Sequence, residues 1–181
     1  VLAGVPELLG AADDVSGFEA HHHPRVAESW RRHSGWRVPM TRLVVDALVP
    51  AIIEQLVTGD EAFRGWRLLV QRFGEPAPGP AAELGMCVAP TPAQWAAIPS
   101  WEWLRAGVDG KRSGAVVRAV RHAGRLEQTV GRPSADVDRA LQSLGGVGVW
   151  TSAEVRQRAH GDADAVSFGD YHVAKDIGWT L

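Results

Sequence analysis

The sequence is poor in cysteine, since Cys87 is the only one among 181 residues. A disulfide framework, a zinc site built on thiolates and an iron–sulfur cluster are therefore excluded. Cys87 has no partner histidine motif and is assigned no role, and low cysteine use fits a reducing, cytoplasmic location. No apolar run approaches the roughly 20 residues that span a bilayer. We therefore expect neither a membrane partner nor a signal peptide.

Sustained alternation of apolar and polar residues is also missing, which argues against strands. Hydrophobic residues make up 45% of the chain and charged residues 22%, a balance that supports a packed core. Helical periodicity predicts an all-α fold, with Asp60, Thr91, Asp109 and Ser134 as N-terminal caps. Residues 75–90 are expected to form a loop. The predicted helices cover 24–33, 43–57, 60–73, 92–97, 100–105, 111–125, 135–143, 149–160 and 170–178.

Charge is unevenly distributed along the chain. The net charge of −2 gives no indication of a nucleic-acid partner, but residues 105–160 hold ten cationic and five acidic side chains, a net charge of +5. A basic segment of this kind suits a phosphate backbone, although solvated helix faces would give the same composition. Three adjacent histidines, His21–His23, cannot all face one ion from a regular helix or strand, so we interpret them as a surface turn.

A glycine-rich turn, Leu-Gly-Gly-Val-Gly-Val-Trp-Thr at 144–151, lies between two predicted helices within 135–160. Such a turn presents backbone N–H groups where the second helix begins, and a phosphate binds there. Asp170 follows 19 residues after Thr151 and can reach the same face. The alternatives are an ordinary tight turn and an aspartate that only caps a helix. The predicted phosphate ligands are the N–H groups of Gly146, Gly148 and Trp150 and the hydroxyl of Thr151.

The turn and the aspartate together resemble the helix–hairpin–helix DNA glycosylase superfamily. Its signature is Leu-Pro-Gly-Val/Ile-Gly followed, one helix and one loop later, by a catalytic aspartate, and Gly145 here replaces the usual proline. The extra freedom of Gly145 is expected to weaken the hairpin. Within the superfamily the sequence is most similar to the bacterial DNA-3-methyladenine glycosylase II branch. Three further segments carry that similarity: 52–58, 90–95 and 107–112.

The resemblance covers roughly residues 40–178. The closing C-terminal helices of the family have no counterpart, so the C-terminus is expected to be truncated. The resulting division is an N-terminal segment, 1–23, and a glycosylase domain, 24–181.

The resemblance implies two helical lobes around a cleft, with Asp170 as the catalytic carboxylate. Trp150 and Tyr171 would line the base pocket, whereas Trp101 and Trp103 are expected to pack inside the protein. Leu56, beside Gln55, would be the wedge that fills the gap left by a flipped nucleotide. Family members also hold a monovalent cation through hairpin carbonyls, which here would be those of Gln142, Leu144 and Val147.

The implied function is excision of alkylated, cationic purines such as 3-methyladenine from double-stranded DNA in base excision repair. No lysine occurs between Lys111 and Lys175, so a monofunctional enzyme without lyase activity is expected. We expect no further cofactor and a cytoplasmic, nucleoid-associated monomer. Two alternatives remain open: a non-catalytic helix–hairpin–helix DNA-binding module, and a glycosylase of the same fold with another lesion preference.

Overall fold

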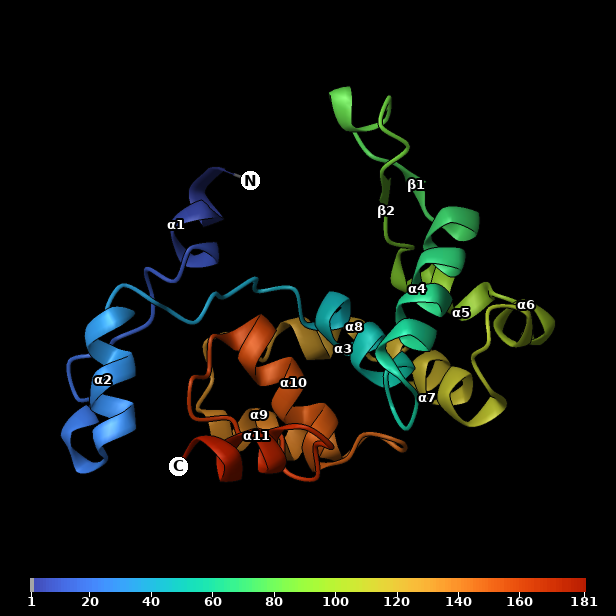
Figure 1. Cartoon of the computed structure of the whole chain (residues 1–181). Coiled ribbons are helices and arrows are strands. Elements are labelled where there is room, and N and C mark those ends of the chain that lie inside the picture. The colour runs from blue at the N-terminus through green and yellow to red at the C-terminus, as the bar shows by residue number, and fades with distance from the viewer. Residues whose placement is uncertain (1) are drawn as a thin grey trace.

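The computed structural model describes residues 2–181, and most of them are helical (Figure 1), which confirms the all-α prediction. The expected loop at 75–90 contains one small antiparallel pairing, with Glu75 opposite Val88. The two paired strands are β1 (Glu75–Pro76) and β2 (Cys87–Val88). The helices of the main body are α3 (Val44–Ile53), α4 (Gly59–Phe73), α5 (Pro92–Ala97), α6 (Ser100–Arg105), α7 (Gly110–Val120), α8 (Ala123–Glu127), α9 (Ser134–Gln142), α10 (Val149–His160) and α11 (Val173–Thr180).

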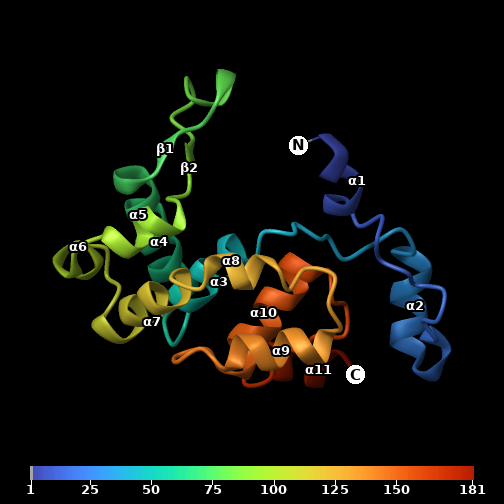
Figure 2. The same ribbon diagram turned by 180° about the vertical axis from the view of Figure 1, so that it is seen from behind.

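Helix α3 is the centre of the core. It packs most extensively against α10 and also contacts α4, α7 and α8. Because α3 has neighbours on several sides, nearly all of its residues are buried, and its sequence is apolar all round rather than along one stripe. Helices α4–α7 lie on one side of α3 and helices α9–α11 on the other (Figures 1 and 2). These two groups are the lobes that the resemblance implied.

Three tryptophans pack together in the α4–α7 lobe. The ring of Trp95 lies 5.6 Å from that of Trp66 and 5.6 Å from that of Trp103, centroid to centroid. Trp103 is buried as expected, but Trp101 is 63% exposed, so the packing role predicted for it is wrong. The reason is geometric, because residues two apart on a helix point to nearly opposite sides.

Both ends of α3 are held by side chains of the α7–α8 segment. The Glu127 carboxylate accepts the N–H groups of Val44 at 3.0 Å and Val45 at 2.9 Å. At the other end, the buried Arg112 guanidinium donates to the carbonyl of Ile53 at 2.7 Å. The helix therefore stops at Ile53, four residues before the predicted end. The predicted helix 111–125 is likewise divided between α7 and α8.

Some of the predicted helix starts are displaced by a few residues. Thr58, not Asp60, caps α4 and forms a reciprocal capping box with Glu61. Ser134 does not cap; it is the first residue of α9, and its hydroxyl bonds to Asp162 instead. The caps at Thr91 and Asp109 are confirmed.

The N-terminal part lies to one side of the two lobes (Figure 1) and contains α1 (Val5–Leu8) and α2 (Pro24–Arg32). Helix α2 packs on residues that precede it, with the rings of Phe18 and Trp30 5.1 Å apart. The division placed at residue 24 therefore stays a prediction. No helix among the described residues has the length and apolar character needed to cross a bilayer.

We predict that Glu127→Ala destabilises the protein by about 2 kcal/mol, because it leaves two backbone N–H groups at the start of α3 without their charged acceptor. Urea unfolding followed by circular dichroism measures this loss. Glu127→Gln keeps one acceptor oxygen and is expected to lose less. Equal losses in the two variants would contradict the role given to the carboxylate.

Candidate active site and nucleic-acid interface

The hairpin turn between α9 and α10 requires glycine at one position. Gly146 has φ +100°, and a Cβ there would lie 2.7 Å from the Cβ of Ala115 on α7. Gly148 has ordinary extended backbone, and no protein atom lies within 4 Å of the place its Cβ would take. Within residues 2–181, neither of these two N–H groups donates to a protein acceptor. Both are therefore free to bind an anion at the start of α10.

Gly145 is held in place by α7. Its carbonyl accepts hydrogen bonds from the Arg118 guanidinium, at 3.1 Å from Nη2 and 3.3 Å from Nε. The freedom expected from the missing proline is thus restricted by a contact that the sequence pattern did not reveal.

Gln55 connects the end of α3 to the hairpin. Its side-chain amide donates to the Gly146 carbonyl at 2.9 Å and to the Thr151 hydroxyl at 2.8 Å. The Thr151 residue is 2% exposed. The predicted contact of its hydroxyl with a phosphate does not fit this placement, because the hydroxyl faces Gln55 inside the protein.

Leu56, next in the chain, is the most exposed large apolar residue of the described chain. It is 99% exposed and has φ +57°, a left-handed conformation that is unfavourable for leucine. An apolar side chain placed in water on unfavourable backbone points to a role outside the fold.

Asp170 lies beside the first turn of α10. Its Oδ2 accepts the indole N–H of Trp150 at 3.0 Å, and its Oδ1 accepts the N–H groups of His172 at 2.8 Å and Val173 at 2.9 Å. The predicted helix at 170–178 therefore begins at Val173, with Asp170 bonding to its first turn. These backbone bonds to Val173 and His172, and then the Trp150 bond, hold the pKa of Asp170 below its ordinary value. Tyr171 is 83% exposed beside it.

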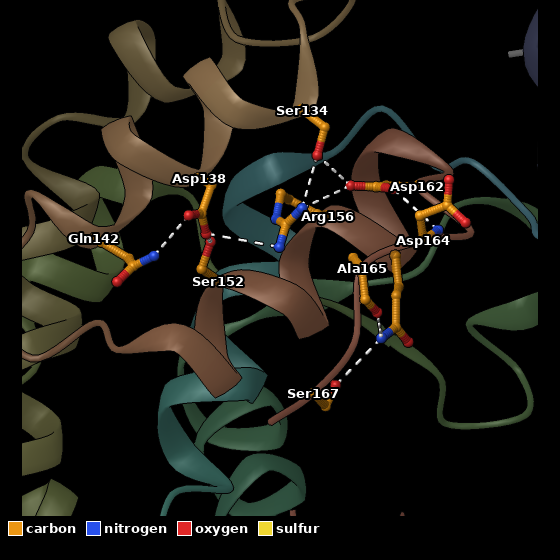
Figure 3. A network of polar contacts seen from close by, with 10 residues as sticks. Ser134, Asp138, Gln142, Ser152, Arg156, Asp162, Asp164, Ala165 and Ser167 are labelled. Carbon is orange, nitrogen blue, oxygen red and sulfur yellow. Dashed lines mark hydrogen bonds and ion pairs between the residues drawn. The ribbon is translucent and has the colours of Figure 1, made fainter. Parts of the chain in front are cut away.

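The loop that leads to Asp170 is bound along α10 (Figure 3). Arg156 forms a largely buried ion pair with Asp162 at 2.8 Å. Gln157 directly follows Arg156 in α10. Its side-chain amide donates to the Ala165 carbonyl and to the Ser167 hydroxyl, farther along the loop. The sequence does not identify Arg156 as the partner of Asp162, since the basic segment before Asp162 holds several arginines.

Comparison by sequence gives no relative: no described family matches the chain, and no curated protein does either. Solved structures do match. The 3-methyladenine DNA-glycosylase of Archaeoglobus fulgidus superposes with a TM-score of 0.81 at 17% identity, over 99% of this chain and 62% of that one. The Clostridium acetobutylicum 8-oxoguanine glycosylase/lyase in complex with double-stranded DNA gives 0.76 at 14% identity, over 98% and 61%. A Bacillus halodurans DNA-3-methyladenine glycosidase gives 0.61 at 18% identity, over 90% and 76%.

The chain has the helix–hairpin–helix glycosylase fold. This confirms the fold class that the hairpin and Asp170 indicated. The chain spans less than two thirds of the length of the first two enzymes. Within this glycosylase fold, the hairpin, the exposed Leu56 and Asp170 all lie around the starting end of α10, connected to it by the bonds of Gln55 and Trp150.

The carbonyls proposed for a cation belong to the end of α9 and the turn, where the last carbonyls of a helix lack N–H donors within the helix. The Leu144 carbonyl accepts the Val147 N–H at 3.0 Å and keeps a second lone pair. Carbonyl oxygens are a donor type that a monovalent cation takes, and the site at Gln142, Leu144 and Val147 stays a prediction.

The histidine run forms the short turn Ala20–His22, as expected for a surface segment. Glu19, His21 and His22 bring ligand atoms within 4.8 Å of one another, but all three are exposed, and Glu19 already pairs with His22. Two cavities, of about 230 Å³ between α4 and α6 and about 730 Å³ between α2 and the end of α11, are not lined by Asp170. The base pocket of Trp150 and Tyr171 therefore stays a prediction.

We predict that Trp150→Phe raises the pKa of Asp170 toward its ordinary value, because the variant lacks the indole N–H. Because folding lowers the pKa of Asp170, its ionised carboxylate stabilises the folded protein at pH values above the unfolded pKa. This stabilisation is lost as the pH falls through the folded pKa. Carboxyl-carbon NMR titration measures the shift. Trp101→Phe, on the exposed side of α6, is the control and should leave the titration unchanged. An unaltered Asp170 titration in Trp150→Phe would disprove the interaction.

Proposed function

We propose that this chain is a DNA N-glycosylase that excises alkylated, cationic purines such as 3-methyladenine from double-stranded DNA and so begins base excision repair. The observation that carries the proposal is the hydrogen bond from Trp150 to Asp170. This bond keeps an ionised carboxylate beside the N-terminal end of α10. The free N–H groups at that end of the helix are suited to bind a DNA phosphate. A phosphate site and a fixed negative charge side by side are what cleavage of a nucleotide's glycosidic bond needs.

The hairpin binds the phosphate backbone of one DNA strand. The N–H groups of Gly146 and Gly148 are joined by that of Trp150, in the first turn of α10, which has no acceptor within the helix. The positive end of the helix dipole adds to their attraction for an anion. The surrounding segment, with its net charge of +5 over 105–160, favours the approach of DNA.

Leu56 supplies the wedge. Extruding a nucleotide costs a few kcal/mol, and an apolar side chain that fills the gap in the stack recovers part of that cost. The exposure of Leu56 suits insertion, since no rearrangement of the protein is needed to free it. Its left-handed backbone, which costs about 1–2 kcal/mol, is kept although no packing of the side chain rewards it.

Asp170 supplies the charge that favours bond cleavage. Departure of the base leaves a positive oxocarbenium sugar, and a carboxylate about 4 Å away contributes about 4 kcal/mol at an effective dielectric constant of about 20. That corresponds to roughly a thousandfold in rate. An ordinary purine would also need an acid to protonate it. Of the two further acids in the loop, Asp162 is paired with Arg156, and Asp164 lies in its exposed part. A purine alkylated at N3 or N7 already carries its positive charge and needs no such acid.

The base itself would lie against aromatic side chains. A cationic purine over the indole of Trp150 gains about 0.5–2 kcal/mol, and Tyr171 is exposed beside it. The charge on the base thus supports both its binding and its departure, which is why alkylated bases are favoured over neutral lesions.

The test is release of 7-methylguanine and 3-methyladenine from duplex DNA by the complete gene product that carries this chain. Asp170→Asn should lower the release rate about a thousandfold. Asp164→Asn, in the exposed part of the preceding loop, is the matched control and should keep wild-type activity. Release of 8-oxoguanine instead would move the protein to another lesion class, and DNA binding without any release would favour the non-catalytic module.

We also expect no covalent protein–DNA adduct when the reaction is treated with borohydride. The lysines among these 181 residues are Lys111 and Lys175, and neither lies near the hairpin turn in sequence. Gel analysis of the borohydride-treated reaction with labelled DNA measures trapping, with a known glycosylase/lyase as positive control. Efficient trapping would refute the monofunctional assignment.

A further inference from the structure

Gln55 joins two parts of the site that are 91 residues apart in sequence. Its amide nitrogen makes two hydrogen bonds to the hairpin, one to the Gly146 carbonyl and one to the Thr151 hydroxyl. An amide has two N–H protons, so both are used inside the protein. The side chain is therefore turned toward the hairpin and away from the surface that Leu56 occupies.

One face of α7 supports the same two parts. Arg112, Ala115 and Arg118 follow one another at intervals of three residues and so share a face of the helix. Arg112 donates to the Ile53 carbonyl at the end of α3. Ala115 lies against Gly146, and Arg118 donates to the Gly145 carbonyl. The end of α3 and the hairpin are thus both supported by α7, and Gln55 also connects them to each other directly.

We propose that Gln55 is a positioning residue that fixes the Leu56 wedge relative to the hairpin. The inference rests on the proposed function, because it gives Leu56 the role of a wedge. A wedge has to enter the stack at a set distance from the phosphate that the hairpin holds. The two amide bonds set that distance, and they also restrain the backbone next to Leu56, whose φ of +57° has no other evident support.

The alternative is that Gln55 itself enters the duplex beside Leu56. The two roles make different predictions for a change at Thr151, which accepts a hydrogen bond from Gln55. Thr151 is 2% exposed and cannot touch DNA through its side chain. Thr151→Val removes one acceptor of Gln55 without changing the shape of the side chain or any group that faces DNA. It should therefore disturb a positioning role and leave a direct contact of Gln55 with DNA intact.

The experiment compares affinity for a duplex carrying a tetrahydrofuran abasic-site analogue with affinity for the undamaged duplex of the same sequence. The ratio of the two reports wedge insertion, and the undamaged duplex alone reports the hairpin. Gln55→Leu should lower the ratio about tenfold and Thr151→Val about threefold to tenfold, with little change in binding to undamaged DNA. Thr151→Ser, which keeps the hydroxyl, should restore the ratio. Urea unfolding confirms that each variant is folded.

A double-mutant cycle with Leu56→Ala gives a second criterion. If Gln55 acts through Leu56, adding Gln55→Leu to Leu56→Ala should cost little more. The inference is overturned if the two losses multiply, or if Gln55→Leu lowers the ratio while Thr151→Val does not. Base release by the wild type is measured separately. If Gln55→Leu and Thr151→Val both lower the affinity ratio but the wild type releases no base, the positioning role is supported and the glycosylase assignment is refuted.

Discussion

The position of Asp170 depends on the ion pair between Arg156 and Asp162. The residues between α10 and α11 form an irregular loop, and such a loop has no ladder of backbone bonds to fix its path. The largely buried pair attaches the start of the loop to α10, and the bonds of Gln157 attach its middle. Trp150 then completes the connection at Asp170 itself. The Asp170 carboxylate is thus positioned relative to α10, the helix that follows the hairpin turn.

The length of α3 is the second constraint on the site. Glu127 fixes where the helix begins and Arg112 fixes where it ends, and both belong to the α7–α8 segment. Because the helix stops at Ile53, the chain is free to turn at Gln55 and present Leu56 in a left-handed conformation. Had the helix continued to residue 57, as its apolar pattern predicts, Leu56 would lie on a regular helix surface and Gln55 would not face the hairpin.

The sequence predicts the parts of the site that are encoded locally. The glycine pattern predicts the hairpin, where Gly146 has a φ that other residues avoid, and the spacing predicts that Asp170 lies near the second helix, where it accepts the Trp150 N–H. Helix identities follow from periodicity in the same way. The inward orientation of Thr151 could not be predicted, because its partner Gln55 comes from a segment 96 residues away. The cap at Ser134 failed for the same reason, since Asp162 draws its hydroxyl away.

Many of the contacts that assemble this site join a side chain to a backbone carbonyl: Arg112 to Ile53, Arg118 to Gly145, Gln55 to Gly146 and Gln157 to Ala165. A main-chain acceptor exists whatever residue stands at that position. Each contact therefore constrains one member of the pair and leaves the other open to mutational drift, without compensating changes. An architecture joined in this way can keep its shape while its residues are replaced almost everywhere else. The structures that superpose on this chain share its fold at 14–18% identity, so the fold is kept although most residues differ.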